Sequence, residues 1–319
     1  MAPEELELVV SVPPHIRERE EVFQIMFWVI LGLLPATLGG IYFFHFYAIK
    51  VIVLSILAAV ATEALFQKAR RLPVTINDGS AIVTGLLLAL CLPPKVPWWI
   101  PVVGGFIAIF LGKQIFGGLG YNIFNPALVA RAVLLLSWAE HMTKDWYTAL
   151  KVDAIARASP LFLAKQVKMG LFQLDLTRFY KICLFGNPSG CIGEVSVLLL
   201  LIGGGILLWR EIIDWRIPAG FIGSVAVLCP LLGMDPIFHV LAGGLILGAF
   251  FMATDYVTSP ITPNGRLLFG IGCGVITILL RSYSILLEGV TYAILFMNAC
   301  TPLIDKYIQP RRFGVSKGK

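Results

Sequence analysis

The chain has 319 residues, of which 58% are hydrophobic and 14% are charged. A soluble globular domain carries roughly 25% charged residues, so this chain has too few charges to cover a surface exposed to water. The formal net charge is +6, but the basic residues are scattered through short segments instead of gathering on one face, which argues against nucleic-acid binding. The composition therefore indicates an integral membrane protein.

Ten apolar runs are candidates for membrane helices. A span needs about 20 apolar residues, and fewer when it is partly buried in protein. We predict spans at Val22–Leu38, Ile41–Phe66, Ser80–Leu92, Trp98–Leu111, Pro126–Trp138, Val195–Trp209, Ile217–Leu232, Phe238–Met252, Leu267–Leu280 and Gly289–Ile304. Several runs are short and rich in glycine, which predicts broken helices that line a site buried within the protein.

The distribution of lysine and arginine predicts the topology. If the N-terminus is cytoplasmic, the short cytoplasmic segments hold 14 basic residues and the short external segments hold 3. The cytoplasmic set is Arg17, Arg19, Lys68, Arg70, Arg71, Lys113, Arg210, Arg216, Arg266, Lys306, Arg311, Arg312, Lys317 and Lys319, and the external set is Lys50, Lys95 and Arg281. Because basic residues accumulate on the cytoplasmic side, both termini are expected there.

The chain divides into two halves around one long polar loop, which this topology places outside. We expect a cytoplasmic tail at 1–20, a five-helix half at 21–138, the external loop at 139–194, a second five-helix half at 195–305 and a cytoplasmic tail at 306–319. An odd number of spans in each half gives the second half the opposite orientation. The expected fold is all-α, with ten transmembrane helices in two inverted repeats and a functional pathway at their interface.

Weak internal similarity supports the repeat. Gly85–Pro93 resembles Gly244–Met252. Gly104 lies nine residues before Lys113, and Gly272 lies nine residues before Arg281.

Polar residues at the ends of the short runs are candidates for an ion pathway. Asp78 precedes the third run, and Asn125 precedes the fifth. At such a position a polar side chain either caps the helix or faces a ligand. Asp255 and Thr258 follow the eighth run and offer the hard oxygen atoms that a cation prefers. Arg131 lies inside a span, where an arginine is costly, so we expect it to bind a cofactor or to pair with an acid.

Other polar residues carry weaker signals. Glu63, Glu211 and Asp214 border spans on the cytoplasmic side and are expected to be solvated. The six cysteines are expected to be buried thiols, although Cys183 and Cys191 can form a disulfide if the loop faces an oxidising side. The histidines show no metal-binding spacing, so no metal site is expected.

Within the external loop, Asp153 is followed six residues later by Ser159, which sits between Ala158 and a proline. A serine hydroxyl can form a phosphoester with the phosphate of flavin mononucleotide (FMN). On its own, however, a Ser-Pro pair in a loop indicates a turn.

Five segments of the chain have a distinctive sequence: Pro14–Arg17, Asn77–Trp99, Gly117–Arg131, Gly248–Gly265 and Glu288–Asp305. They resemble a family with two kinds of member. One is the D subunit of Rnf complexes, which are ion-translocating ferredoxin:NAD+ oxidoreductases, and the other is the B subunit of the Na+-translocating NADH:quinone reductase. The chain length fits the Rnf protein better.

This resemblance implies a flavoprotein of the bacterial or archaeal cytoplasmic membrane. It implies an FMN attached to Ser159 by an FAD-dependent transferase, with serine in place of the family's threonine and with Ala156 and Arg157 departing from its motif. It implies a non-covalent riboflavin between helices, and Asn125, Arg131, Asp153 and Ala158 are candidate cofactor contacts. Expected partners are the A, B, C, E and G subunits of the Rnf complex, the transferase, membrane lipid, and Na+ or H+.

Two other functions remain open on the sequence. An inverted repeat also fits a channel or permease of the urea-transporter type, which has no use for a covalent flavin. The B subunit of the quinone reductase would instead depend on ubiquinone.

Overall fold

A computed structural model describes residues 22–143, 176–186, 190–283 and 289–309, and these residues form helices without any strand. The N-terminal part contains α1 (Val22–Phe44), α2 (Phe46–Ala69), η1 (Ile76–Asp78), α3 (Ser80–Leu90), α4 (Trp99–Ile109), η2 (Phe110–Gln114), α5 (Pro126–Ser137) and α6 (Ala139–Thr143). The C-terminal part contains α8 (Leu176–Phe185), η4 (Ile192–Glu194), α9 (Val197–Trp209), α10 (Arg216–Leu231), α11 (Pro236–Leu241), α12 (Leu245–Leu247), η5 (Gly248–Met252), α13 (Pro263–Tyr283) and α14 (Gly289–Tyr307).

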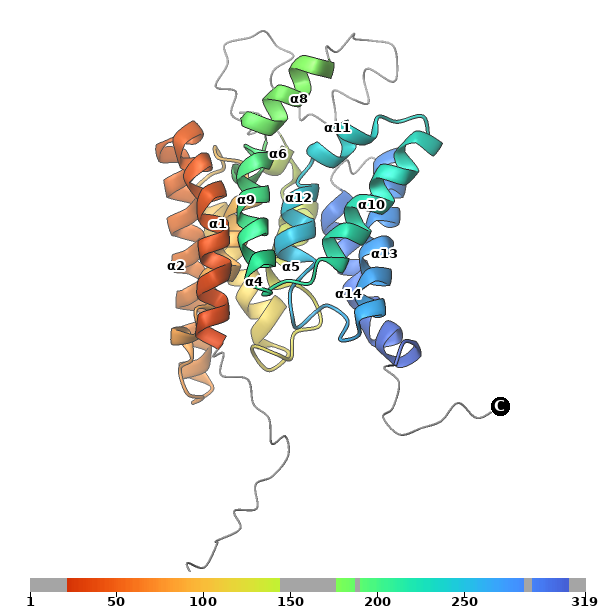
Figure 1. Cartoon of the computed structure of the whole chain (residues 1–319). Helices are drawn as coiled ribbons and strands as arrows, with labels where there is room; N and C mark the ends of the chain where they lie inside the picture. The colour runs from red at the N-terminus through yellow and green to blue at the C-terminus, as the bar shows by residue number, and fades with distance from the viewer. Residues whose placement is uncertain (1–21, 144–175, 187–189, 284–288, 310–319) are drawn as a thin grey trace, which may run out of the picture.

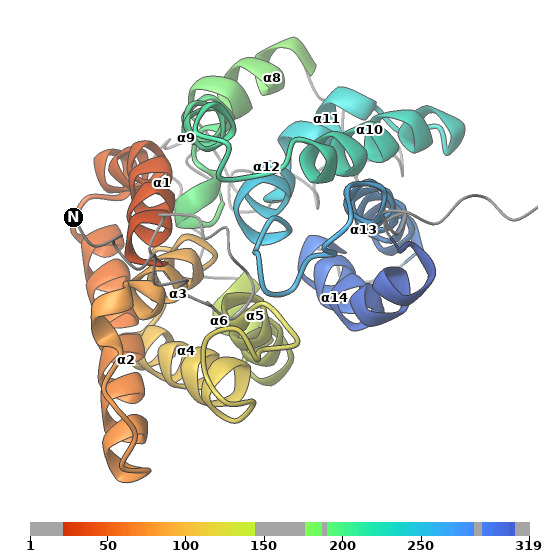
Figure 2. The ribbon, with the colours of Figure 1, turned by 60° about the horizontal axis from the view of Figure 1, so that its bottom comes forward.

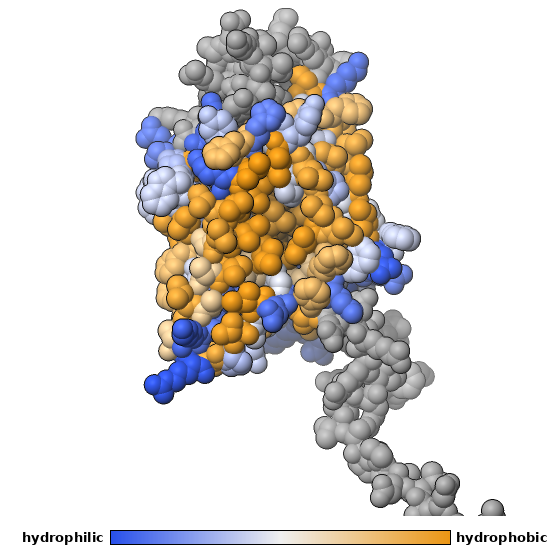
Figure 3. Space-filling model, turned by 90° about the vertical axis from the view of Figure 1, so that its left-hand side faces the viewer, coloured by the Kyte–Doolittle hydropathy of each residue, from blue (hydrophilic) through white to orange (hydrophobic). Residues whose placement is uncertain are grey.

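The surface of the helix bundle is apolar across its middle. Figure 3 shows hydrophobic side chains over this band and hydrophilic ones toward both ends. Exposed residues of α1 and α2, including Phe27, Leu34, Val53 and Leu57, contribute to this surface. Among the described helices, α1, α2 and α13 are each long and apolar enough to cross a membrane, and shorter apolar helices accompany them. The chain is therefore a multi-pass membrane protein.

The largest differences from the expected spans are at the end of the first helix and the start of the second. The first helix continues through Pro35 to Phe44 instead of ending at Leu38, because the break comes at His45, whose φ is 49°. A positive φ is strained for a residue with a side chain, and it interrupts the helical path. The second helix consequently begins at Phe46 instead of Ile41.

The eighth run is broken, as expected for a site-lining segment. It forms α11, then α12, then the π-helix η5, with Gly243 (φ 71°) and Gly244 (φ 64°) between α11 and α12. Glycine accepts this left-handed conformation without a steric penalty. A similar glycine, Gly79 (φ 76°), stands immediately before α3.

Close helix contacts hold each part together. A Cβ atom added to Gly105 of α4 would lie 2.8 Å from the Ala58 side chain of α2. A Cβ atom added to Gly270 of α13 would lie 2.5 Å from the backbone oxygen of Ile217 in α10. Small residues that let helix backbones approach are typical of membrane bundles.

The short helices lie inside the bundle. Figure 2 shows α3, α5 and α12 between α1 and α2 on one side and α10 and α13 on the other. In Figure 1 the start of α1 and the end of α14 lie at one end of the bundle, which we call the inner end, and α8 lies at the other, the outer end. The hydroxyl of Tyr180 in α8 donates to the carboxylate of Asp235, which also caps α11, so α8 is tied to the second part of the chain.

Candidate functional site

The entry to α3 gathers polar groups at the inner end of the bundle. The carboxylate of Asp78 accepts hydrogen bonds from both the backbone N–H of Ser80 (2.8 Å) and its hydroxyl (2.6 Å). Asp78 therefore satisfies the first free N–H of the helix, as a capping residue does. Because the Ser80 proton points at Asp78, the lone pairs of the Ser80 oxygen remain available on its other side.

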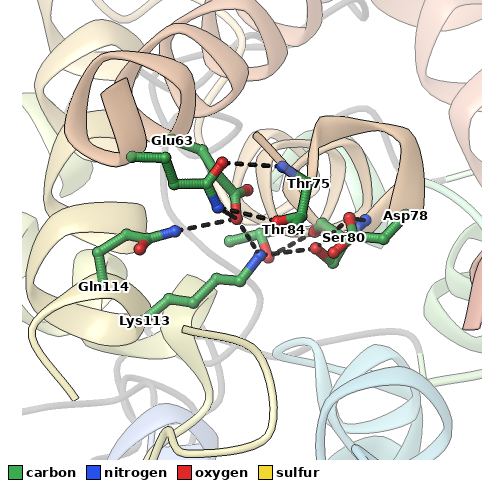
Figure 4. Close-up of polar contacts among 8 residues, drawn as sticks. Glu63, Thr75, Asp78, Ser80, Thr84, Lys113 and Gln114 are labelled. Atoms are coloured by element: carbon green, nitrogen blue, oxygen red, sulfur yellow. Dashed lines mark hydrogen bonds and ion pairs between the residues drawn. The ribbon is translucent and has the colours of Figure 1, made fainter. Parts of the chain in front are cut away.

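A buried ion pair faces this oxygen (Figure 4). The Lys113 ammonium lies 2.6 Å from Glu63 Oε1 and donates to Ser80 Oγ at 2.6 Å. The side chains of Lys113 and Glu63 are 2% and 0% exposed. Gln114 Nε2 also donates to Glu63 Oε1, at 2.9 Å, and Gln67 lies between Glu63 and Thr75. We call Glu63, Gln67, Asp78, Ser80, Lys113 and Gln114 the inner network.

The expectation that Glu63 is solvated was wrong, as was the placement of Lys113 in a cytoplasmic segment. The helix α2 runs past Glu63 to Ala69, and the π-helix η2 extends α4 beyond its expected end at Leu111. Both side chains therefore stay within the bundle. Two buried charges lose their hydration, and only mutual pairing with further hydrogen bonds offsets that loss. Counting charges in the sequence does not reveal this pairing. The available signal was a glutamate and a lysine at the edges of two apolar runs, which could have suggested an ion pair.

A cavity of about 80 Å³ adjoins the inner network. Ser80 and Lys113 form part of its wall, together with Asn125 and Asp255. Met26 of α1, and Phe250 and Phe251 of η5, are among its apolar lining residues. A space of this size holds a few water molecules.

The structure brings the four predicted pathway residues together around this cavity. Asn125 and Asp255 line it directly. Thr258 donates its hydroxyl to Asp255 (3.1 Å), and Asp78 contacts the cavity-lining Ser80, so these two residues lie one hydrogen bond behind the wall. Asn125 also caps α5 and donates to the Met252 carbonyl (3.2 Å), so it joins α5 to η5.

Asn298 of α14 completes this junction and was missed in the sequence. In the amide orientation that satisfies both of its polar atoms, it donates to Ile294 and accepts from the backbone N–H of Asn125 (3.1 Å). The two asparagines therefore link α5 and α14 next to the cavity.

Arg131 of α5 is buried, as expected for an intramembrane arginine. Its Nη2 lies 3.9 Å from Glu194 Oε1 and 3.5 Å from the sulfur of Cys191. Pairing with an acid was one of the two expectations for this residue. Cys183 and Cys191 are both buried and form no disulfide, and burial raises the pKa of the Cys183 thiol to about 12, which makes that thiol a poor nucleophile.

Arg281 was counted as an external residue but is buried at the end of α13. Its guanidinium donates to the backbone carbonyls of His239 (2.5 Å), Ala242 (3.0 Å) and Gly243 (3.2 Å). These carbonyls are left without helical partners where the chain breaks before α12. Removing Lys113 and Arg281 from the charge count changes it from 14 against 3 to 13 against 2, so the topology prediction stands.

Asp214, between α9 and α10, is also less solvated than expected. It accepts from Arg216 and Arg266, each at 3.0 Å. Burial acts to raise the pKa of Asp214, but the hydrogen bonds from Arg216 and Arg266 and the charge of Arg216 outweigh it and hold this pKa below its ordinary value. Asp153, Ala158 and Ser159 lie outside the described residues.

Residues 9–314 match the NQR2, RnfD, RnfE family. The chain belongs to that family. It is 47% identical, over 99% of its length and 98% of the relative's, to the D subunit of the Na(+)-translocating ferredoxin:NAD(+) oxidoreductase complex of Acetobacterium woodii. It is 45% identical, over 97% of its length and 96% of the relative's, to the D subunit of the proton-translocating ferredoxin:NAD(+) oxidoreductase complex of Clostridium ljungdahlii. It is 40% identical, over 93% of its length and 93% of the relative's, to the D subunit of the ion-translocating oxidoreductase complex of Stutzerimonas stutzeri. The family expected from the sequence motifs is thus confirmed.

Proposed function

We propose that the protein is the D subunit of an Rnf-type ferredoxin:NAD+ oxidoreductase complex, in which electron transfer drives the movement of Na+ or H+ across the cytoplasmic membrane. The observation that carries this proposal is the 47% identity, over nearly the full length of both chains, with the corresponding protein of a complex that is described as Na+-translocating. A relative at 45% identity belongs to a complex that is described as proton-translocating, so both ions remain candidates. The expected partners are the other subunits of that complex.

We infer that the bundle consists of ten transmembrane segments in two inverted halves, 21–138 and 195–305. The contacts support this: α2 packs against α4 as α10 packs against α13, and α4 packs against α5 as α13 packs against α14. The contacts of α1 with α9 and of α5 with α14 join the halves. The common position of the described chain ends, opposite α8 in Figure 1, agrees with two cytoplasmic termini and an external loop at 139–194.

Two local features also support the repeat. A left-handed glycine immediately precedes the third helix of each half, Gly79 before α3 and Gly244 before α12. The basic residue that ends the fourth long segment of each half reaches that same helix entry, Lys113 in the first half and Arg281 in the second. These features favour an alignment of the two halves that matches Gly79 with Gly244. The sequence comparison instead matched Gly85 with Gly244, a difference of six residues.

In this proposal Ser159 holds an FMN through a phosphoester, on the external side. The attached FMN and a non-covalent riboflavin would supply one- and two-electron transfer. The cavity beside the inner network does not fit a whole flavin, because about 80 Å³ is well below the several hundred Å³ of a typical cofactor pocket. We therefore assign no riboflavin contact there, and Asn125 and Arg131 remain candidates only.

The cavity suits a small ion with water. Asp255 and Ser80 supply carboxylate and hydroxyl oxygen atoms on its wall, and Thr258 and Asp78 lie behind them. Oxygen atoms of these types are the usual ligands of hard cations. We propose that the coupled ion passes through this cavity, at the interface of the two halves.

The decisive experiment is fluorescence of the denatured protein in a gel under ultraviolet light, after expression with its flavin transferase. The wild type should give a fluorescent band, and Ser159→Ala should give none. Ser189→Ala is a control that leaves Ser159 in place. A non-fluorescent wild type, with the transferase shown to be active on another substrate, would remove the flavin from the proposal and favour a permease.

A further inference from the structure

The inner network resembles a cation-binding site, but the bound cation is the ammonium group of the protein's own Lys113. The Lys113 ammonium is held by a carboxylate oxygen of Glu63 and the hydroxyl oxygen of Ser80, both at 2.6 Å. The Ser80 proton is directed to Asp78, so Ser80 can only accept from the ammonium. Carboxylate and hydroxyl oxygens are also what a monovalent metal ion requires, and these two oxygen atoms are not specific to an amine.

The charges of the network are not balanced. Glu63 and Asp78 provide two carboxylates against the single ammonium of Lys113. Glu63 is fully buried, and its Oε2 has no hydrogen-bond partner among the described residues. A buried carboxylate with one unused oxygen is costly, so it favours the approach of a further cation or a proton.

The cavity beside Lys113 offers space for its side chain when the ammonium leaves Glu63. Its side chain lines the cavity of about 80 Å³, and Asp255 lines the same cavity. A lysine carries its charge on a flexible four-carbon stem with rotatable donors, so its ammonium can exchange one oxygen partner for another. Lys113 therefore contacts one acid, Glu63, in the network and shares its cavity with a second, Asp255.

The second half of the fold has a different arrangement at the matching position. There Arg281 donates to three backbone carbonyls through a planar, permanently charged group. Such a fork is held by several hydrogen bonds at once and is suited to a fixed structural role. The inverted halves thus differ at this position, with an exchangeable ammonium in the first and a fixed guanidinium in the second.

We propose that Lys113 is an internal competitor of the transported ion at Glu63. In one state the Lys113 ammonium binds Glu63 and Ser80; in the other a Na+ ion or a proton occupies Glu63, and Lys113 turns into the cavity toward Asp255. The return of Lys113 to Glu63 releases the ion. This inference rests on the proposed ion translocation and names the device that exchanges the ion.

The test uses inverted membrane vesicles that contain the whole complex. Ferredoxin-dependent reduction of NAD+ and uptake of ²²Na+ are measured against Na+ concentration, and against pH in Na+-free buffer. Lys113→Met removes the competitor and should lower the half-saturating Na+ concentration about tenfold, or raise the midpoint pH by about one unit if the ion is H+, while turnover falls. Ser80→Ala removes an oxygen atom that holds the ammonium in one state and is available to the ion in the other, so it should change the half-saturating Na+ concentration less than Lys113→Met does.

A matched control is Lys50→Met. Lys50 lies in α2 and is partly buried, but it donates to the backbone carbonyl of Val96 (3.1 Å). The half-saturating concentration of this variant should equal that of the wild type. Equal losses of turnover in Lys113→Met and Ser80→Ala, without a shift of either midpoint, would show that the network is only structural and would overturn the inference. A wild type that moves no ion would instead overturn the proposed function.

Discussion

The tight contact between α10 and α13 gives the most direct test of the packing. A Cβ atom at Gly270 would lie 2.5 Å from the backbone oxygen of Ile217, about 0.9 Å closer than the 3.4 Å of ordinary contact. The partner is backbone, so a side-chain rotation cannot relieve it. At Gly223 of α10, an added Cβ atom meets nothing within 4 Å. Gly270→Ala and Gly223→Ala are therefore the same chemical change with and without a clash.

The expected difference between these variants follows from two terms. Replacing glycine by alanine inside a helix gains up to about 1 kcal/mol in either variant, so this term cancels. Overpacking costs about 1–3 kcal/mol, and we expect the upper part of that range at Gly270 because two helix backbones must separate. With an unfolding entropy of about 2.1 cal/mol/K per residue, a difference of about 3 kcal/mol over 319 residues lowers the melting temperature of Gly270→Ala by about 5 °C relative to Gly223→Ala.

The cysteines provide the assay. None of the six forms a disulfide, and five of them are buried, so a thiol-reactive fluorescent dye reports unfolding of the purified chain in detergent. If Gly270→Ala melts at or above the temperature of Gly223→Ala, close approach at this position does not hold α10 to α13, and the packing argument fails.

Two further predictions concern acids. Asp255→Ala should abolish ion uptake in vesicles while NAD+ reduction falls much less, and equal loss of both would instead indicate a structural role for Asp255. Asp214→Asn should destabilise the chain by about 1 kcal/mol at neutral pH, the usual scale for a partly exposed ion pair. Because the pKa of Asp214 is lowered by folding, its contribution is complete above the unfolded value of about 3.9 and disappears as the pH falls through the folded value. The melting temperatures of wild type and Asp214→Asn should therefore differ at pH 7 and approach each other as the pH falls below the unfolded value.

The apolar runs predicted the helices well where a turn signal marked the boundary. Asn125 with Pro126 predicted the start of α5, and the polar stretch at Asp78 and Gly79 predicted the start of α3. The predicted end of α1 at Leu38 was wrong, because the break depends on the backbone conformation of His45. A hydropathy profile gives no information about that backbone conformation.

The candidate site was predicted only in part. Asn125 and Asp255 belong to different halves of the sequence, and the inverted-repeat argument placed them at one interface, where both line the cavity. Glu63 and Lys113 were assigned to water because each stands at the edge of an apolar run. Glu63 already lay inside the expected second span, but its pairing needs α4 to continue into η2 past Leu111 and to meet α2 in space, and neither residue alone carries that information.

The π-helix η2 makes the position of Lys113 depend on the number of residues before it. A π-helix holds about one residue more than an α-helical turn, so η2 accommodates one extra residue without turning the rest of the segment. The loss of one residue from the regular part of α4 before η2 would instead rotate Lys113 by about 100° about the helix axis, and its ammonium would point away from Glu63. Removal of one residue from the following turn, where Gly117, Gly118 and Gly120 have positive φ, would leave that geometry intact. Insertions and deletions, more than substitutions, should therefore separate working from failing variants of this segment.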